Sequence, residues 1–167
     1  MKLINVKKIF STIIVAAALC SFMPASYQPD LSGTWKLNEG KSDLGQFGGR
    51  GIATKIVAEQ KADAITLTKT SSMQGQENTT TETLLFSGKE SELTMGNNAK
   101  KKSILKWSAD GNTMIVTYDL SVSFNGQSFD IKGVENWSLS ADGKNLTINT
   151  TLTTPQGDIA TKAVYDK

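Results

Sequence analysis

The chain has 167 residues, of which 38 % are hydrophobic, with 18 lysines and arginines against 16 acidic residues, one cysteine and no histidine. This length fits one small globular domain. The absence of histidine excludes an imidazole base, a Ser-His or Cys-His nucleophile pair, a His-rich zinc site and a haem held by a proximal histidine.

Residues 1–27 have the pattern of a signal peptide that is removed on export. Lys2, Lys7 and Lys8 give a positively charged start, and the run 9–19 that follows is apolar. This apolar run is too short to span a bilayer, and a proline and small residues end it. We therefore expect a cleaved segment and no integral membrane segment in the mature protein.

Residues 28–167 are then the mature domain, which we place in the periplasm or outside the cell. A lipid anchor on Cys20 is the alternative to simple cleavage, although Leu19 stands where such sites carry a small residue. Without the three lysines of residues 1–27, 15 basic residues remain against 16 acidic ones, a net charge of −1. We expect no nucleic acid partner for such a domain. The basic run 100–102 is interpreted as a solvated turn or edge-strand face.

Beyond residue 30 the residues alternate with a period of two, and no helical periodicity is found. Short turns separate the extended segments, which predicts an all-β, antiparallel up-and-down meander of eight to ten strands. Closing this sheet, or nearly closing it, into a barrel removes its exposed edges. The predicted strands cover residues 32–38, 52–60, 63–72, 77–86, 91–95, 100–108, 112–124, 127–139, 145–154 and 158–167.

The connection 39–51 (EGKSDLGQFGGRG) is rich in glycine. It does not lead from a strand into an amphipathic helix, so we do not interpret it as a phosphate-binding loop. Two interpretations remain open, a flexible flap over the barrel mouth and a surface loop that exposes Arg50.

The dipeptide 125–126 (Asn-Gly) is typical of a two-residue hairpin turn. In such a hairpin Val116 lies opposite Glu135, on a face that is otherwise almost entirely apolar. On the other face Asp119 lies opposite Lys132, and this pair of opposite charges supports the register.

Turns at 109–111 and 141–143, both Ala-Asp-Gly, extend this register to the neighbouring strands. A loop over 155–158 then places Thr150 beside Ala163. Reading across the strands gives three layers of inward side chains. The first layer consists mostly of large side chains and fills one end of the barrel, whereas the next two contain small and polar residues and predict a cavity. The layers are Trp107, Met114, Trp137, Ile148 and Tyr165; then Leu105, Val116, Glu135, Thr150 and Ala163; then Ser103, Tyr118, Gly133, Leu152 and Thr161.

Glu135 is the most informative residue, because a buried carboxylate is costly unless it is paired, hydrogen-bonded or protonated. It could anchor a ligand inside the barrel. Alternatively, a bulge at Gly133 turns Glu135 out to water, or the barrel mouth is simply wet. The predicted ligand-binding residues are Glu135, Tyr118, Ser103, Thr150 and Thr161.

The tryptophans could stack on a ligand, but aromatic residues at alternating strand positions are more often core. We therefore interpret Trp107 and Trp137 as structural, together with Tyr165 at the barrel end.

The stretch 31–38 (LSGTWKLN), followed by KSDLG, and the strand-turn unit 137–144 (WSLSADGK) resemble secreted bacterial lipocalin-like domains. The resemblance implies a lipocalin-like, calycin-type barrel that binds small apolar or amphipathic molecules. It also implies that Trp35 packs at the closed end of the barrel under a basic side chain from near the C-terminus. This chain departs from that pattern, because it has no arginine near the C-terminus, and we take Lys162 as the nearest cation.

We therefore expect an exported, non-catalytic binding protein for a small hydrophobic or amphipathic ligand. The alternative is a secreted or envelope protein-interaction module whose barrel is filled and holds no ligand. An enzyme would need carboxylate chemistry around Glu135, and the register places no second carboxylate inside. No cofactor and no metal are expected, because the Asp-Gly turns lack the alternating acidic ligands that calcium needs.

Overall fold

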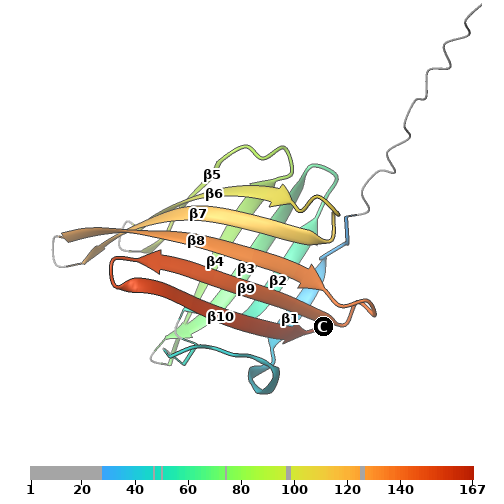
Figure 1. The fold of residues 1–167 in the computed structure, drawn as a ribbon, viewed down its shortest axis with the longest axis horizontal. Coiled ribbons are helices and arrows are strands. Elements are labelled where there is room, and N and C mark those ends of the chain that lie inside the picture. The colour runs from blue at the N-terminus through green and yellow to red at the C-terminus, as the bar shows by residue number, and fades with distance from the viewer. Residues whose placement is uncertain (1–27, 47, 50, 74, 97–98, 125–126) are drawn as a thin grey trace, which may run out of the picture.

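A computed structural model describes residues 28–46, 48–49, 51–73, 75–96, 99–124 and 127–167. Three predicted features lie outside the described residues: the signal peptide with Cys20, the exposure of Arg50 and the Asn-Gly turn at 125–126. The fold is all-β, as predicted, and each of the ten predicted strands is found with ends that differ by at most one residue (Figure 1). The strands are β1 (Gly33–Leu37), β2 (Ala53–Gln60), β3 (Ala64–Met73), β4 (Gln76–Leu85), β5 (Ser91–Thr94), β6 (Lys100–Trp107), β7 (Thr113–Phe124), β8 (Gln127–Leu139), β9 (Asn145–Thr154) and β10 (Gly157–Asp166).

These strands form one antiparallel sheet in the order β4-β3-β2-β1-β10-β9-β8-β7-β6-β5. The first strand pairs with the last in the middle of this order, through Lys36 opposite Asp166. The sheet curls until β4 approaches β6, where Glu82 contacts Lys101. Its two edges are β4 and β5, and the described residues form no backbone ladder between them. The barrel is therefore nearly closed, with one seam. No helix among the described residues has the length and hydropathy needed to cross a membrane.

The predicted register is confirmed in three hairpins and wrong in one. Val116 lies opposite Glu135, and Glu135 opposite Thr150. In the last hairpin, however, Thr150 lies opposite Thr161 rather than Ala163. The reason is the turn, which contains only Pro155 and Gln156 because β10 already begins at Gly157. The shift amounts to two residues, so each side chain keeps its predicted face while the predicted layers change.

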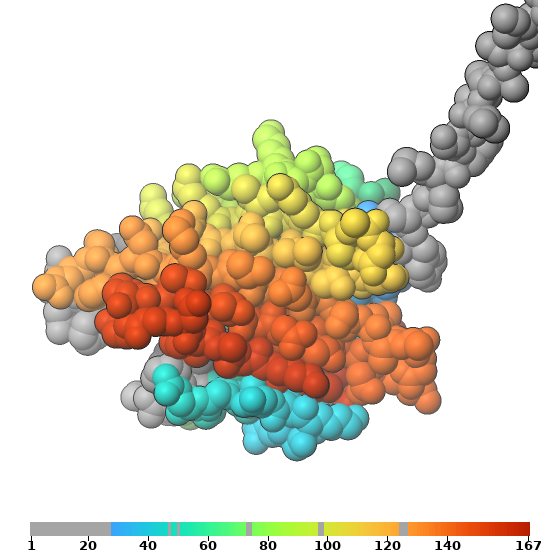
Figure 2. Space-filling view, in the orientation of Figure 1, coloured from blue at the N-terminus to red at the C-terminus, as the bar shows by residue number. Residues whose placement is uncertain are grey.

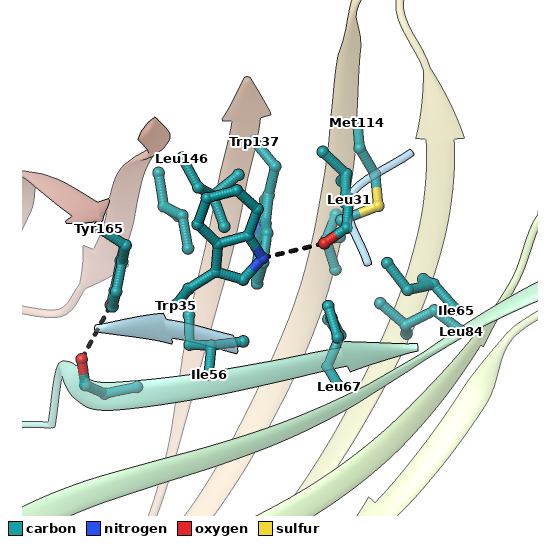
Figure 3. Close-up of a cluster of buried hydrophobic side chains, with 14 of the residues drawn as sticks. Leu31, Trp35, Ile56, Ile65, Leu67, Leu84, Met114, Trp137, Leu146 and Tyr165 are labelled. Atoms are coloured by element: carbon teal, nitrogen blue, oxygen red, sulfur yellow. Dashed lines mark hydrogen bonds between the residues drawn. The ribbon is translucent and has the colours of Figure 1, made fainter. Parts of the chain in front are cut away.

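One end of the barrel is filled by a packed cluster around Trp35 (Figure 3). Trp35 is completely buried, and its indole Nε1 donates a hydrogen bond of 2.9 Å to the carbonyl of Leu31. The ammonium of Lys167 lies 5.3 Å from the centre of the Trp35 ring. The cation over this tryptophan is thus Lys167. Lys162, taken from the sequence as the nearest cation, does not have this position; it is exposed and pairs with Asp43 through the backbone.

The other three aromatic residues predicted at this end differ in burial. Trp137 is fully buried, and Tyr165 is nearly so, with its hydroxyl donating to the carbonyl of Ala53 at 3.0 Å (Figure 3). Trp107 is only half-buried, because it is the last residue of β6, and it packs on Phe86 with 6.1 Å between ring centres.

The opposite end of the barrel is the end where β3, β7 and β9 finish. The hairpin of β7 and β8 projects there beyond its neighbours, since β9 pairs with β8 only from Lys132 onward (Figures 1 and 2). The described part of the glycine-rich connection lies along β10, to which Asp43 is bridged at Lys162 (Figure 2). It contains only a short 3-10 turn, η1 (Glu39–Lys41).

Candidate functional site

A cavity of about 390 Å³ lies inside the barrel, between the packed cluster and the end where β3, β7 and β9 finish. Its position is the one predicted from the layers of small and polar residues, and the filled barrel of the alternative interpretation is not observed. The apolar lining comprises Leu44, Ile52, Ala53, Ile56, Met95, Leu120, Ile131, Ile148, Leu152, Ile159 and Ala163, with Gly51. The polar lining comprises Lys69, Ser71, Asn78, Thr80, Tyr118, Glu135, Thr150, Thr161 and Tyr165.

Glu135 points into this cavity and is only 9 % exposed. The pairing of β8 with both neighbours is regular around Gly133, so the bulge that would turn Glu135 outward is absent. The ammonium of Lys69 donates to both carboxylate oxygens of Glu135, at 3.0 and 3.2 Å. The indole Nε1 of Trp137 donates to the same carboxylate at 2.9 Å.

These contacts keep the Glu135 carboxyl ionised. Burial opposes ionisation and is the largest single effect, but the charges of Lys69 and Lys101 and the hydrogen bonds from Lys69 and Trp137 outweigh it. The net result is a pKa of Glu135 below its ordinary value. The ammonium of Lys69 also lies 4.9 Å from the centre of the Trp137 ring, so the indole contacts both members of the ion pair.

Tyr118 lies directly over Gly133, its partner on β8. A Cβ atom at position 133 would overlap the phenol ring, so the missing side chain of glycine is what makes room for Tyr118. Burial, together with the negative charges of Glu135 and Glu82, raises the pKa of the Tyr118 hydroxyl well above its ordinary value. The hydroxyl is therefore a protonated hydrogen-bond donor at neutral pH.

A second buried ion pair crosses the seam of the barrel. The ammonium of Lys101 on β6 lies 2.7 Å from Glu82 of β4, and Ser103 donates a hydrogen bond to the same carboxylate. Lys101 also lies 4.4 Å from the centre of the Tyr118 ring. The interpretation of the basic run 100–102 as a solvated face is therefore wrong for its middle residue, which is 8 % exposed.

Four of the five predicted ligand-binding residues line the cavity, namely Glu135, Tyr118, Thr150 and Thr161. Ser103 is buried but does not line the cavity, because its hydroxyl is bound to Glu82. The predicted register covers only β6 to β10 and has Glu135 as its single inward carboxylate. Glu82 lies on β4, outside that register, and is a second buried carboxylate.

Lys69 on β3 and Glu82 on β4 are buried polar residues that were not predicted from the sequence. Both continue an alternation of buried residues, Ile65 and Leu67 leading to Lys69 and Leu84 leading to Glu82. The alternation of inward and outward side chains along these two strands was the signal that could have identified them, because it continues past the last apolar residue.

Among the described residues, no group of three or more cysteine or acidic side chains is placed to hold a metal ion. No protein family model matches the chain, and no curated protein matches it. One solved structure that is similar is zebrafish ileal bile acid-binding protein in complex with cholic acid. The identity is 19 %, the match covers 81 % of this chain and 97 % of that one, and the TM-score is 0.49.

Proposed function

We propose that this chain is an exported binding protein that holds a small hydrophobic or amphipathic molecule inside its barrel and does not catalyse a reaction. The observation that carries this proposal is the cavity of about 390 Å³. Pockets for small molecules fall mostly between about 300 and 1,000 Å³ and combine apolar walls with a few placed polar groups.

The division of the cavity lining supports an amphipathic occupant. Ile52, Leu120, Leu152 and other aliphatic side chains supply walls against which a hydrocarbon portion can be buried. Glu135 and Lys69 supply polar atoms at one place, where they fix the position of a head group.

The chemistry of Glu135 supports binding rather than catalysis. A general acid at neutral pH needs a raised pKa, whereas the pKa of Glu135 is lowered by its surroundings. The hydrogen bonds from Lys69 and Trp137 also stabilise the charged carboxylate, so it is a weak base toward a substrate proton.

Export is proposed from the pattern of residues 1–27. The mature domain, residues 28–167, contains no cysteine, which suits an oxidising compartment. Expressing the full chain in a bacterium, fractionating the cells and sequencing the mature N-terminus tests this part. A mature chain that starts near residue 28 in the periplasm or medium supports it, a lipid-bearing Cys20 supports the anchored alternative, and an uncleaved cytoplasmic chain overturns it.

The binding proposal is tested by calorimetric titration with a panel of lipids, sterols, retinoids and tetrapyrroles. We expect at least one class to bind, and we expect Thr150→Phe to weaken this binding by about tenfold or more because the ring fills the cavity. Thr151→Phe is the matched control, because Thr151 is the next residue on β9 and is exposed. Binding that survives Thr150→Phe, or no binding by any class, contradicts the proposal.

A further inference from the structure

The polar part of the cavity is built around one ion pair that spans the interior. Lys69 lies on β3 and Glu135 on β8, and the strands β2, β1, β10 and β9 separate them along the sheet. Their side chains nevertheless meet at 3.0 Å, so they reach each other across the barrel. Both side chains line the cavity and are shielded from solvent: 22 % of the Lys69 side chain and 12 % of the Glu135 side chain, counted without backbone, are exposed.

This pair leaves the described cavity wall without net charge. Lys69 and Glu135 are the charged residues of the described lining, one positive and one negative. The neighbouring pair of Lys101 and Glu82 is likewise balanced, at 2.7 Å. A charged head group therefore finds no unpaired partner of opposite sign on this wall.

A ligand of either charge meets one like charge at close range. A carboxylate that approaches Lys69 must come near the Glu135 carboxylate, which is held within 3.2 Å of the same ammonium. An ammonium group that approaches Glu135 comes near Lys69 in the same way. Like charges in a shielded site repel more strongly than they do in water.

An uncharged group that both donates and accepts meets no such penalty. The Lys69 ammonium has three donors, and the Glu135 carboxylate has about four acceptor sites, not all of which the pair and Trp137 occupy. A hydroxyl or a primary amide can therefore accept from Lys69 and donate to Glu135 at once. Thr150 and Tyr118 add further hydroxyls to the same cavity.

We propose that the Lys69–Glu135 pair makes this cavity selective for amphipathic molecules with an uncharged hydroxyl or amide head group, against carboxylates and amines of the same chain length. Glu135 is then the residue that sets specificity, because it cancels the charge of Lys69. This inference rests on the proposed function, a binding barrel, and adds the class of head group that it accepts.

The test uses four molecules that share one hydrocarbon chain: 1-decanol, decanamide, decanoate and decylamine. Each is titrated calorimetrically into the purified exported protein at neutral pH. We expect the alcohol and the amide to bind about tenfold or more tightly than the acid and the amine.

The decisive variant is Glu135→Gln, which has nearly the same shape and keeps an acceptor for Trp137. It leaves Lys69 without a counter-ion, so we expect the preference for decanol over decanoate to fall by about tenfold or to reverse. Lys69→Met leaves Glu135 unpaired and shifts the preference toward decylamine. If that variant does not fold, Glu135→Gln alone decides.

Asp119→Asn is the matched control. It also removes one carboxylate from the same hairpin, but Asp119 is an exposed residue, paired with Lys132. We expect this variant to leave the ratio of decanol to decanoate binding unchanged.

The two proposals fail in different ways. If the wild-type protein binds decanoate as tightly as decanol, or if Glu135→Gln does not move the ratio, the selectivity inference is overturned and the binding function stands. If none of the four molecules binds, and no member of the broader panel does, both proposals are overturned.

Discussion

The seam between β4 and β5 provides the sharpest stability prediction, because side chains hold it together where no backbone ladder is described. Lys101 and Glu82 meet at 2.7 Å with 10 and 6 % of their side chains exposed. Lys101→Met removes the cation and leaves a buried carboxylate with Ser103 as a partner. Removing one member of a buried pair costs about 3–5 kcal/mol, and the remaining hydrogen bond places this case near the lower limit.

A loss of about 3 kcal/mol corresponds to a fall in Tm of roughly 10 °C for a domain of this size. The measurements are urea unfolding and thermal unfolding followed by circular dichroism. Adding Glu82→Gln to Lys101→Met removes the stranded charge and keeps an acceptor for Ser103, so we expect at least half of the lost stability to return.

The matched control for this prediction is the pair of Lys132 and Asp119, which has the same separation of 2.7 Å but is 74 and 63 % exposed. Lys132→Met should leave the free energy of unfolding nearly unchanged, because an exposed ion pair contributes little to stability. If Lys101→Met is as mild as Lys132→Met, or if the double variant is no more stable than the single one, the reasoning about the seam is refuted.

Three further predictions concern other buried contacts. Gly133→Ala should lower the free energy of unfolding by about 1–3 kcal/mol, because the added Cβ overlaps Tyr118, and Tyr118→Leu in the same chain should recover part of the loss in urea unfolding. The pKa of Glu135 is lower in the folded protein than in the unfolded chain, so its ionised carboxylate stabilises the fold at neutral pH. This stability is lost as the pH falls from the ordinary carboxyl pKa through the folded-state pKa. Thermal scans from neutral to acidic pH should thus show a smaller drop in Tm for Glu135→Gln than for the wild type, and an equal drop would contradict this. Trp35→Phe should cost about 2 kcal/mol or more in urea unfolding, because the buried Leu31 carbonyl loses its donor, and an unchanged midpoint would refute this.

The hairpins of the C-terminal half could be predicted because their turns are short and chemically specific. The Asn-Gly dipeptide predicts that Val116 faces Glu135, and the Ala-Asp-Gly turns extend this register to β6 and β9, as the strand pairs show. Once Val116 faces Glu135, the carboxylate must point inward. The last hairpin was harder, since both a two-residue and a four-residue loop keep the side chains on the same faces. The error of two residues therefore left Thr161 inside but changed its partner to Thr150.

The partners of Glu135 could not be predicted in the same way. Lys69 reaches it across the interior from β3, which four strands separate from β8 along the sheet. The register of neighbouring strands does not say which residue on the opposite wall a long side chain reaches. The burial of Lys101 has a similar origin, because its partner Glu82 lies across the seam rather than on a paired strand. Local alternation identifies which side chains point inward, and the closure of the barrel determines which of them meet.

Native mass spectrometry of the purified protein shows whether its barrel carries a small molecule. The protein is purified without denaturant, and any molecule that it releases is identified after extraction. We expect the mass of the chain plus one molecule with a hydrocarbon portion and an uncharged hydroxyl or amide head group. This extra mass is expected to disappear in Thr150→Phe and to remain in Thr151→Phe. A bare chain that also binds nothing on titration, or an extra mass that Thr150→Phe does not remove, would contradict it.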